Sequence, residues 1–382
     1  MGKEAEDGEK VEQVLCMNGG ESETSYAKNS NLQRAVMFSA RHILKESVID
    51  VFNIFSSSKC LAVADLGCGT GPNALLAVSD IVNIVCRTRD DMGHKSPNSF
   101  LLFLNDLPSN DFNTIFKSLA SFDAFFRRDQ CFVMAVPGSL HGRLFPCKSL
   151  NFVHSSYCLH WLSQVPKGLV DENGEALDKT TICLAETSSL AVQKAYAEQF
   201  REDFHAFLKS RSEELRPGGS MVLTFLGSAR SNAPFKVFEV ISQTLGEMGQ
   251  EDLINESKLD TFKLPFHAAS CDQVSEVIIN EGSFNIRKLE AFKTSWDTGM
   301  DESVLYNKGK AGGGEFVAKS LRAVLEPLLV AAFGEVVMDE LFGRVAVKFE
   351  ELMNIAGDCY YHNIIVWLTK NASMMELPSS ND

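Results

Sequence analysis

The sequence predicts an α/β fold, in which a mostly parallel sheet carries helices on both faces and a helical cap domain covers one end. Three observations predict it. From residue 61 onward, short β-branched or aromatic runs alternate with amphipathic stretches, the first run ends in a glycine-rich turn, and the alternation fades after residue 227. Strands that alternate with helices pair in parallel, because each helix returns the chain to the same end of the sheet.

The individual elements follow from composition and apolar spacing. A helix over 30–55 comes first, because apolar residues recur at helical spacing, and we expect it to cover the glycine-rich turn as part of a lid. Further helices are predicted over 191–215, ended by Gly218, and over 316–352. Six runs have the composition of strands, at 61–65, 100–105, 131–136, 151–156, 221–226 and 363–368.

The same pattern divides the chain into a core and a cap. The α/β core is expected over 21–227 and 355–370. A mostly helical cap that shapes the substrate pocket is expected over 228–354, where Pro265 and the glycines at 312–314 break the regularity. A polar segment, 1–20, precedes the core, and a flexible tail, 371–382, follows it.

Composition and charge exclude several classes of protein. With 382 residues, 45% of them hydrophobic, the chain can bury a large core. The net charge of −14, with Lys and Arg scattered, argues against nucleic acid as a partner, since phosphate binding needs clustered cations. We find no export signal, no apolar run long enough to cross a membrane and no Cys-x-x-Cys pair among the ten cysteines. We therefore expect a cytoplasmic protein with reduced cysteines and no membrane partner.

The turn after the first strand indicates a cofactor pocket. It reads Asp-x-Gly-x-Gly-x-Gly from Asp65 to Gly71, and its glycines allow the backbone to pass close to a ligand. A dinucleotide site reads Gly-x-Gly-x-x-Gly and seats a pyrophosphate, whereas an acid before the first glycine suits a cation. The sulfonium and α-amino groups of S-adenosylmethionine are cationic. We interpret the turn as the first motif of a Rossmann-like class I methyltransferase, with a glycine-rich turn in another α/β protein as the alternative.

The ends of the next two strands supply further candidates, because ligands of open α/β sheets bind beyond the carboxyl ends of the strands. Asp106 follows the second strand, where its carboxylate would hold the two ribose hydroxyls or, alternatively, cap a helix. Ser139 and Leu140 follow the third strand. They would lie along the adenine, with Ser139 forming a hydrogen bond and Leu140 packing on the ring.

Three polar aromatic side chains follow the fourth strand within a short span. Tyr157, His160 and Trp161 are residue types that often lie in a core. Together, just beyond a cofactor-binding strand, they favour a substrate pocket, because such rings enclose an apolar ligand and offer donors to its polar end.

With these motifs in place, the chain resembles the plant SABATH methyltransferases. Members of that family methylate the carboxylate of acids such as salicylate, benzoate, jasmonate and indole-acetate, or ring nitrogens of xanthines. The resemblance spans nearly the whole chain. Its motifs lie at 17–20, 25–30, 65–73, 105–113, 137–146, 155–165 and 322–334.

The resemblance implies roles for individual residues and a homodimeric assembly. Gln33 and Trp161 would hold and align the acceptor carboxylate as the catalytic pair. Together with Gly67 and Gly69 of the turn, the residues implied to contact S-adenosylmethionine are Tyr26, Ser30, Asp65, Asn73, Asp106, Leu107, Ser139 and Leu140. Besides Gln33 and Trp161, those implied to line the acceptor pocket are Tyr157, His160, Val237, Phe238, Leu321, Val324 and Tyr361.

A magnesium site is the one implied feature that the residues oppose. Some members bind magnesium near the pocket, at positions matching Asp178, Asp260 and the carbonyl of Phe262, with Asn where this chain has Lys263. An ammonium beside a divalent cation is unfavourable, because such ions need neutral or anionic oxygen ligands. Lys263 therefore argues against a bound ion, and the two acids would then be ordinary surface residues.

The hypothesis from the sequence is methyl transfer from S-adenosylmethionine to a small aromatic or lipophilic carboxylic acid, which gives a methyl ester and S-adenosylhomocysteine. His160 and Phe238 replace the Met and Trp of salicylate-selective members, so salicylate itself is not implied. Methylation of a xanthine-like ring nitrogen and a non-catalytic receptor for small acids are the alternatives. A nicotinamide dehydrogenase is a weaker one, because the glycine spacing differs.

Overall fold

The computed structural model describes residues 15–122, 130–231, 235–300, 312–355 and 359–371. Most of the polar segment assigned to 1–20 and nearly all of the tail assigned to 371–382 lie outside the described residues. The strands are β1 (Cys60–Leu66), β2 (Ser99–Asp106), β3 (Cys131–Pro137), β4 (Leu150–Ser156), β5 (Leu215–Gly227), β6 (Phe284–Ser295) and β7 (Tyr360–Lys370). The helices are α2 (Tyr26–Asn29), α3 (Asn31–Phe55), α4 (Pro72–Asp91), α5 (Phe112–Ser118), α7 (Leu190–Glu214), α8 (Lys236–Gln250), α9 (Glu256–Thr261), α10 (Cys271–Glu281), α12 (Gly313–Phe333) and α13 (Met338–Ile355).

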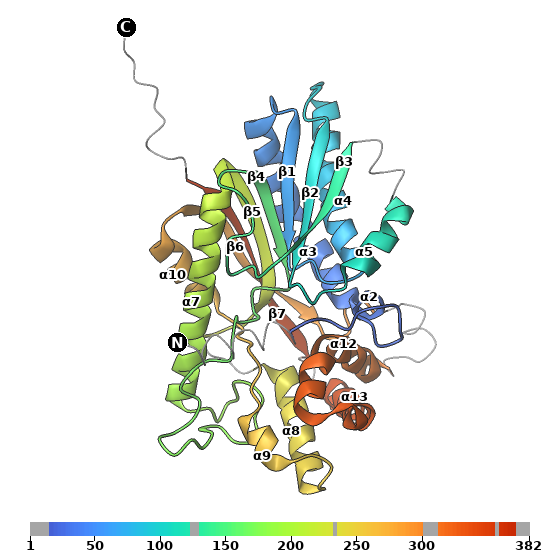
Figure 1. Ribbon diagram of the computed structural model, residues 1–382, viewed down its shortest axis with the longest axis vertical. Coiled ribbons are helices and arrows are strands. Elements are labelled where there is room, and N and C mark those ends of the chain that lie inside the picture. The colour runs from blue at the N-terminus through green and yellow to red at the C-terminus, as the bar shows by residue number, and fades with distance from the viewer. Residues whose placement is uncertain (1–14, 123–129, 232–234, 301–311, 356–358, 372–382) are drawn as a thin grey trace.

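All seven strands belong to one sheet in the order β3-β2-β1-β4-β5-β7-β6. The first five pair in parallel, and β7 runs antiparallel to both β5 and β6. Helices α7 and α10 cover one face, α3 and α4 cover the other, and α8, α9, α12 and α13 gather at one end of the sheet (Figure 1). The predicted α/β class and the mostly parallel sheet are confirmed.

Strand β6 is the one strand of the described sheet that the sequence did not predict. Its residues alternate apolar and charged side chains, including Arg287, Lys288 and Glu290, and many of them are partly or fully exposed. Charged residues are typical of an edge strand, where they discourage pairing with other chains, and they hide the strand in a search for apolar runs. The range 228–354 is therefore not all cap, because β6 completes the sheet and α10 packs on β6 and α7.

Two other local expectations are corrected. Helix α3 is not part of a lid, because it packs along α4 and the sheet and only its first turns reach the end where the cap lies. Gly218 does not end the helix before it: α7 stops at Glu214, and Gly218, with φ +78°, lies four residues further on at an irregular stretch of β5. The long C-terminal helical stretch is confirmed, with a break at Gly334 between α12 and α13.

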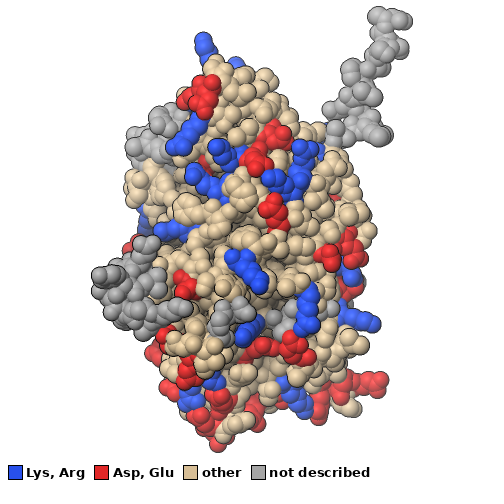
Figure 2. Space-filling view, turned by 180° about the vertical axis from the view of Figure 1, so that it is seen from behind, with Lys and Arg blue, Asp and Glu red and all other residues tan. Residues whose placement is uncertain are grey.

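The charge on the outer surface and the polarity of the helices bear on whether the protein binds nucleic acid or a membrane. On the face shown in Figure 2, the described Lys and Arg side chains alternate with Asp and Glu, and acidic side chains gather at the lower end. None of the helices that the structure describes is long and apolar enough to cross a bilayer.

Candidate active site

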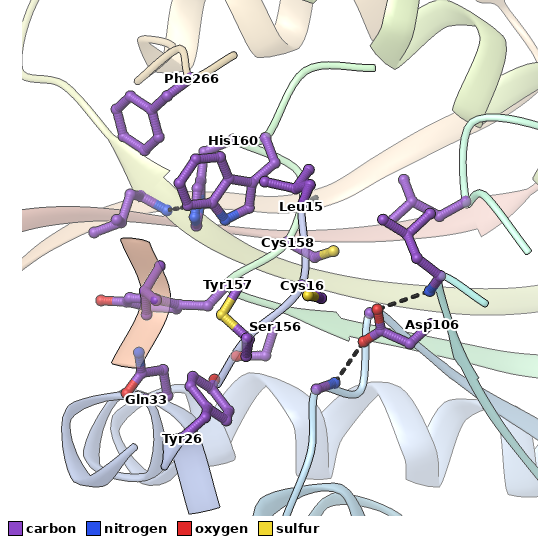
Figure 3. A pocket seen from close by; sticks show the side chains of 18 of the residues that line it. Leu15, Cys16, Tyr26, Gln33, Asp106, Ser156, Tyr157, Cys158, His160 and Phe266 are labelled. Atoms are coloured by element: carbon purple, nitrogen blue, oxygen red, sulfur yellow. Dashed lines mark hydrogen bonds between the residues drawn. The ribbon is translucent and has the colours of Figure 1, made fainter. Parts of the chain in front are cut away.

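The cavity that brings most of the predicted site residues together, called the main cavity below, lies where the carboxyl ends of the strands meet the cap. Its walls come from the turn after β1, the loops after β2, β3 and β4, the first turns of α3, and the cap helices α8 and α12 (Figure 3). The cavity is partly open to solvent. Elements from both halves of the chain are therefore needed to close it.

The glycine turn brings its backbone into contact with neighbouring loops. Gly67, Gly69 and Gly71 have φ values of +69°, +64° and +104°, a region that glycine adopts without strain. A Cβ on Gly67 would lie 2.1 Å from the Sγ of Cys158, and one on Gly71 would lie 2.8 Å from the Cα of Ala27. Glycine is thus required here by close approach as well as by conformation, and Gly67 and Gly69 line the cavity as predicted.

Asp106 is the acid at the cofactor end of the cavity. Its carboxylate accepts hydrogen bonds from the backbone N–H of Gly69, at 2.7 Å, and of Leu107, at 2.8 Å. Burial raises its pKa to about 6, although these two bonds act in the opposite direction. The helix-cap alternative is wrong for Asp106, because Asp111 caps α5 by accepting from the N–H of Thr114.

Most of the predicted site residues meet in this cavity. Besides the two glycines, those that line it are Gln33, Trp161, Tyr26, Asp106, Leu107, Ser139, Leu140, Tyr157, His160, Phe238, Leu321, Val324 and Tyr361. In Figure 3, Asp106 lies on one side of the cavity and His160 and Phe266 on the other. The cavity therefore has a polar end suited to a ribose and an aromatic end.

Four predicted residues do not line the cavity: Ser30, Asp65, Asn73 and Val237. Asp65 accepts a hydrogen bond from His154 Nδ1 at 2.7 Å, and the Asn73 amide donates to the hydroxyl of Ser30 at 3.0 Å. These polar groups are buried, and Val237 is part of the hydrophobic core. The carboxylate of Asp65 thus has a partner within the protein, which the sequence did not indicate.

The aromatic end of the cavity offers hydrogen-bond donors without a cation. Gln33 is buried, and its amide makes no hydrogen bond to the described residues. The indole N–H of Trp161 likewise has no acceptor among them. His160 accepts the N–H of Leu226 at Nδ1, at 3.1 Å, and burial lowers its pKa to about 3. The ring is therefore neutral and carries its proton on Nε2.

Tyr157 is held in an unusual conformation beside these donors. Its φ of +62° is uncommon for a residue with a side chain, and its ring meets His160 edge to face. The hydroxyl donates to Asn363 Oδ1 at 2.5 Å, and the amide of Asn363 donates to the hydroxyl of Thr294 at 2.9 Å. Strands β7 and β6, at one edge of the sheet, thus hold Tyr157 in the wall of the cavity through Asn363 and Thr294.

Sequence reasoning missed about half of the wall. Leu15, Cys16 and Met17 come from the chain before α2, while Phe235 and Phe266 come from irregular segments of the cap. Phe266 packs against the rings of Trp161 and His160. No periodic pattern marks these residues. The signals in the sequence are the motif at 17–20, which includes Met17, and the predicted break at Pro265, next to Phe266.

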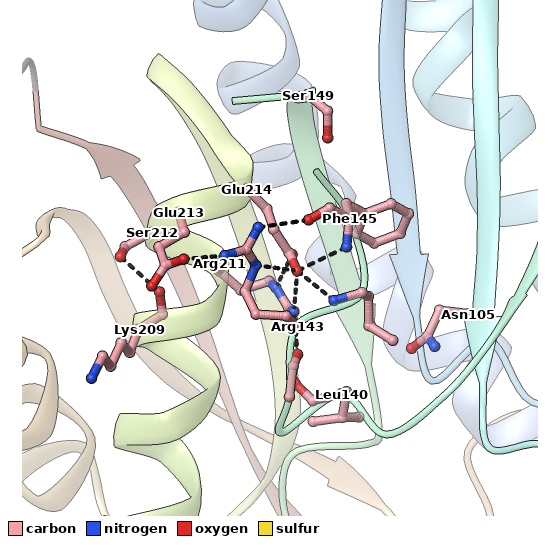
Figure 4. A network of polar contacts seen from close by, with 12 residues as sticks. Asn105, Leu140, Arg143, Phe145, Ser149, Lys209, Arg211, Ser212, Glu213 and Glu214 are labelled. Carbon is pink, nitrogen blue, oxygen red and sulfur yellow. Dashed lines mark hydrogen bonds and ion pairs between the residues drawn. The ribbon is translucent and has the colours of Figure 1, made fainter. Parts of the chain in front are cut away.

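A buried ion pair fixes the loop that carries Ser139 and Leu140. Arg211 and Glu214, both on α7 and fully buried, are joined at 2.7 Å. The guanidinium donates to the carbonyls of Leu140, at 2.9 Å, and Gly142, at 2.7 Å, and Glu214 accepts from the N–H of Phe145 at 3.0 Å (Figure 4). The pair satisfies loop backbone groups that would otherwise be buried without partners.

The residues proposed for magnesium do not fit a metal ion. The ammonium of Lys263 donates to the carbonyls of Thr181, at 2.6 Å, and Asp260, at 2.8 Å, and also to that of Phe262, the expected metal ligand. Burial lowers the pKa of Lys263 to about 8. Asp178 and Asp260 accept backbone N–H groups, and no group of three acidic, His or Cys side chains suited to a metal occurs among the described residues.

The sheet order, the glycine turn after β1 and the acid after β2 define a class I methyltransferase with an added cap. The model of the SAM-dependent carboxyl methyltransferase family matches residues 12–371, and the chain belongs to that family. It is 41% identical to a benzoic acid/salicylic acid carboxyl methyltransferase of Petunia hybrida, over 94% of this chain and 99% of the relative. It is 38% identical to a probable caffeine synthase of Coffea canephora, over 94% and 98%.

A solved structure supports the same assignment. Loganic acid methyltransferase with S-adenosylhomocysteine superposes with a TM-score of 0.82 at 30% identity, and the match covers 94% of this chain and 99% of that one. The predicted family, fold class and S-adenosylmethionine dependence are confirmed.

Replacing Arg211 with Met should destabilise the protein by about 3–5 kcal/mol, because Glu214 would lose its buried cation and keep only the more exposed Arg143, 3.5 Å away. The same substitution should weaken S-adenosylhomocysteine binding, since the Ser139–Leu140 loop loses its support. Arg201→Met on the same helix is the matched control, because Arg201 forms an exposed ion pair with Glu198. Urea unfolding and calorimetric affinity measure both effects, and equal midpoints for the two variants would contradict the assigned role.

Proposed function

We propose that this carboxyl methyltransferase acts on a small aromatic or lipophilic acid, in the class of benzoate, salicylate or jasmonate. The observation that carries the proposal is that neither the Gln33 side-chain amide nor the Trp161 indole N–H has a hydrogen-bond partner among the described residues, in an otherwise largely apolar part of the cavity. Each of the two groups can donate a hydrogen bond. Two such donors suit the two oxygens of a carboxylate. The neighbouring rings of Phe238 and Phe266 suit an apolar body.

The residues around the donors are sufficient for the reaction without a general base. A carboxylic acid with a pKa of about 4 is already ionised at neutral pH. The protein therefore has to remove water from the carboxylate and hold one oxygen in line with the reacting carbon. S-adenosylmethionine supplies an electrophilic methyl group when bound. Neutral donors fit this task, because a cation would stabilise the ground-state anion more than the transition state, in which its charge is being lost.

We infer that the Nε2–H of His160 is a third donor and contributes to the choice of acceptor. Because the ring is neutral, it discriminates by geometry and hydrogen bonding and not by charge. It lies between Tyr157 and Trp161, with which it makes ring contacts. A second polar group on the acceptor, or the second carboxylate oxygen, would accept from it.

We assign the other end of the cavity to the cofactor. Asp106 would accept from the ribose hydroxyls, and Ser139 and Leu140 would lie along the adenine, as the sequence predicted. Tyr26, Leu107, Gly67 and Gly69 complete that end. Ser30, Asp65 and Asn73 would then act behind the wall, through the buried hydrogen bonds described above. Homodimer formation and cytoplasmic location remain predictions from the resemblance and the composition.

The experiment that tests the proposal is incubation of the purified protein with methyl-labelled S-adenosylmethionine and a panel of acceptors. The panel holds benzoate, salicylate, cinnamate, jasmonate, indole-acetate and a xanthine. Labelled methyl ester from one or a few acids is the expected result. Labelled N-methyl xanthine as the sole product would contradict the proposal, and S-adenosylhomocysteine binding without any product would favour a receptor.

Replacing Trp161 with Ala should lower turnover of the best acid by about a hundredfold, because the carboxylate loses an aligning donor and its surrounding ring. Affinity for S-adenosylhomocysteine should stay unchanged. Trp161→Phe keeps an aromatic ring and removes the N–H. Its turnover should lie between that of the unsubstituted protein and that of Trp161→Ala. Steady-state kinetics and calorimetry separate these effects, and a loss confined to cofactor affinity would refute the role given to Trp161.

Affinity for S-adenosylhomocysteine should fall as the pH is lowered through about 6. The pKa of Asp106 is raised to about 6, so the side chain is an ionised carboxylate above that pH. Below it the carboxyl group is protonated and is a weaker hydrogen-bond acceptor. If only the ionised form accepts from the ribose, affinity drops about tenfold per pH unit below the pKa. Asp106→Asn should bind weakly with no such dependence.

Asp111→Asn is the control for this pH dependence. Asp111 caps α5, and its hydrogen bonds hold its pKa below the usual range, so it does not titrate near pH 6. Its substitution should leave the profile of affinity against pH unchanged. Calorimetric titrations between about pH 5 and about pH 8 provide the measurement. A flat profile in the unsubstituted protein would show that Asp106 does not hold the ribose.

A further inference from the structure

A second cavity lies between the sheet and the helices α3 and α4, on the face away from α7. Its apolar wall includes Met37, Ala40 and Leu44 of α3, Leu76 and Ala77 of α4, and Val222 of β5. The cavity measures about 160 Å³. Cavities of about 150 Å³ in proteins accept one benzene molecule, so this one has room for a single six-membered ring.

Two polar side chains in this wall have unused hydrogen-bonding capacity. The hydroxyl of Ser79 is buried, with the residue 7% exposed, and has no hydrogen-bond partner among the described residues. His154 donates from Nδ1 to Asp65, and no described residue bonds its Nε2. Buried polar groups without partners are costly, which favours a site that a ligand completes.

The charge at this cavity selects the kind of ligand. Arg34 lines it, and the guanidinium donates to the amide oxygen of Asn73 at 3.2 Å, while no carboxylate of the described residues lies within ion-pair distance. Asp80 also lines the cavity, but Arg41 neutralises it with bonds of 2.5 and 2.7 Å. Arg34 is thus a partly buried cation available for an anion at the edge of an apolar space.

We propose that this second cavity binds a single-ring compound with a carboxylate, with the ring between α3 and α4 and the carboxylate on Arg34. The exposed ring of Phe38, 61% accessible at the cavity wall, would cover the outer side of the ligand. The site is separated from the main cavity by the sheet. Its ligand contacts none of the residues assigned to the transfer reaction.

The probe is 4-fluorobenzoate, added to the protein loaded with S-adenosylhomocysteine. Fluorine NMR should resolve two bound populations, and a crystal soaked with the probe should show one molecule between α3 and α4. Ala77→Leu should remove that population alone, because the larger side chain fills the cavity. Ala35→Leu, on α3 but outside the cavity wall, should keep both.

The part played by Arg34 has its own control. Arg34→Met should weaken binding of 4-fluorobenzoate at this site about tenfold, with little effect on the uncharged 4-fluorobenzamide. Lys45→Met, an exposed cation elsewhere on α3, should change neither. The proposal is overturned by an empty space between α3 and α4 in the soaked crystal, or by two populations that both survive Ala77→Leu. Loss of the main-cavity population alone would instead count against the proposed acceptor class.

Discussion

The site depends on the turn after β1, whose glycine positions have no room for a side chain. At Gly67 a single added carbon would lie 2.1 Å from the sulfur of Cys158, so the loop after β4 packs directly on the turn after β1. Adjacent parallel strands make this possible, because their carboxyl ends arrive at the same edge. This contact between the two loops forms part of the cavity wall at the end assigned to the cofactor. Asp106 extends it by accepting the N–H of Gly69, which joins the end of β2 to the same turn.

Buried polar contacts connect the loops around this turn to the rest of the fold. The Arg211–Glu214 pair ties the loop after β3 to α7, and the chain from Tyr157 through Asn363 to Thr294 ties the loop after β4 to the edge of the sheet. Each set of contacts joins segments that are far apart in sequence and gives buried polar groups a partner. Gln33 and Trp161 differ, because both line the cavity and neither the Gln33 amide nor the Trp161 N–H has a partner among the described residues, so a ligand can supply one.

The electrostatics of the cavity differ between its two ends. Near Asp106 burial raises an acid pKa to about 6, so the carboxylate is still ionised at neutral pH but becomes protonated in mild acid. Near His160 burial lowers a base pKa to about 3, so that end contains donors and no charge. Such a division suits a polar nucleoside at one end and a desolvated acid at the other. Lys263, whose ammonium donates to three backbone carbonyls, lies outside the cavity wall.

The sequence by itself determined the class of fold, the position of the glycine turn and about half of the residues that line the cavity. Those features are local: an apolar run, an acid and glycines at fixed spacing, and aromatic residues just after a strand. The tertiary structure alone decided the rest. Strand β6 was missed because this edge strand is rich in charged residues, and Phe266 because irregular segments have no period. The Asp65–His154 contact was missed because it joins two neighbouring strands, β1 and β4, that are far apart in sequence. Contacts between distant residues depend on how the sheet and cap close on each other, and no local spacing records that.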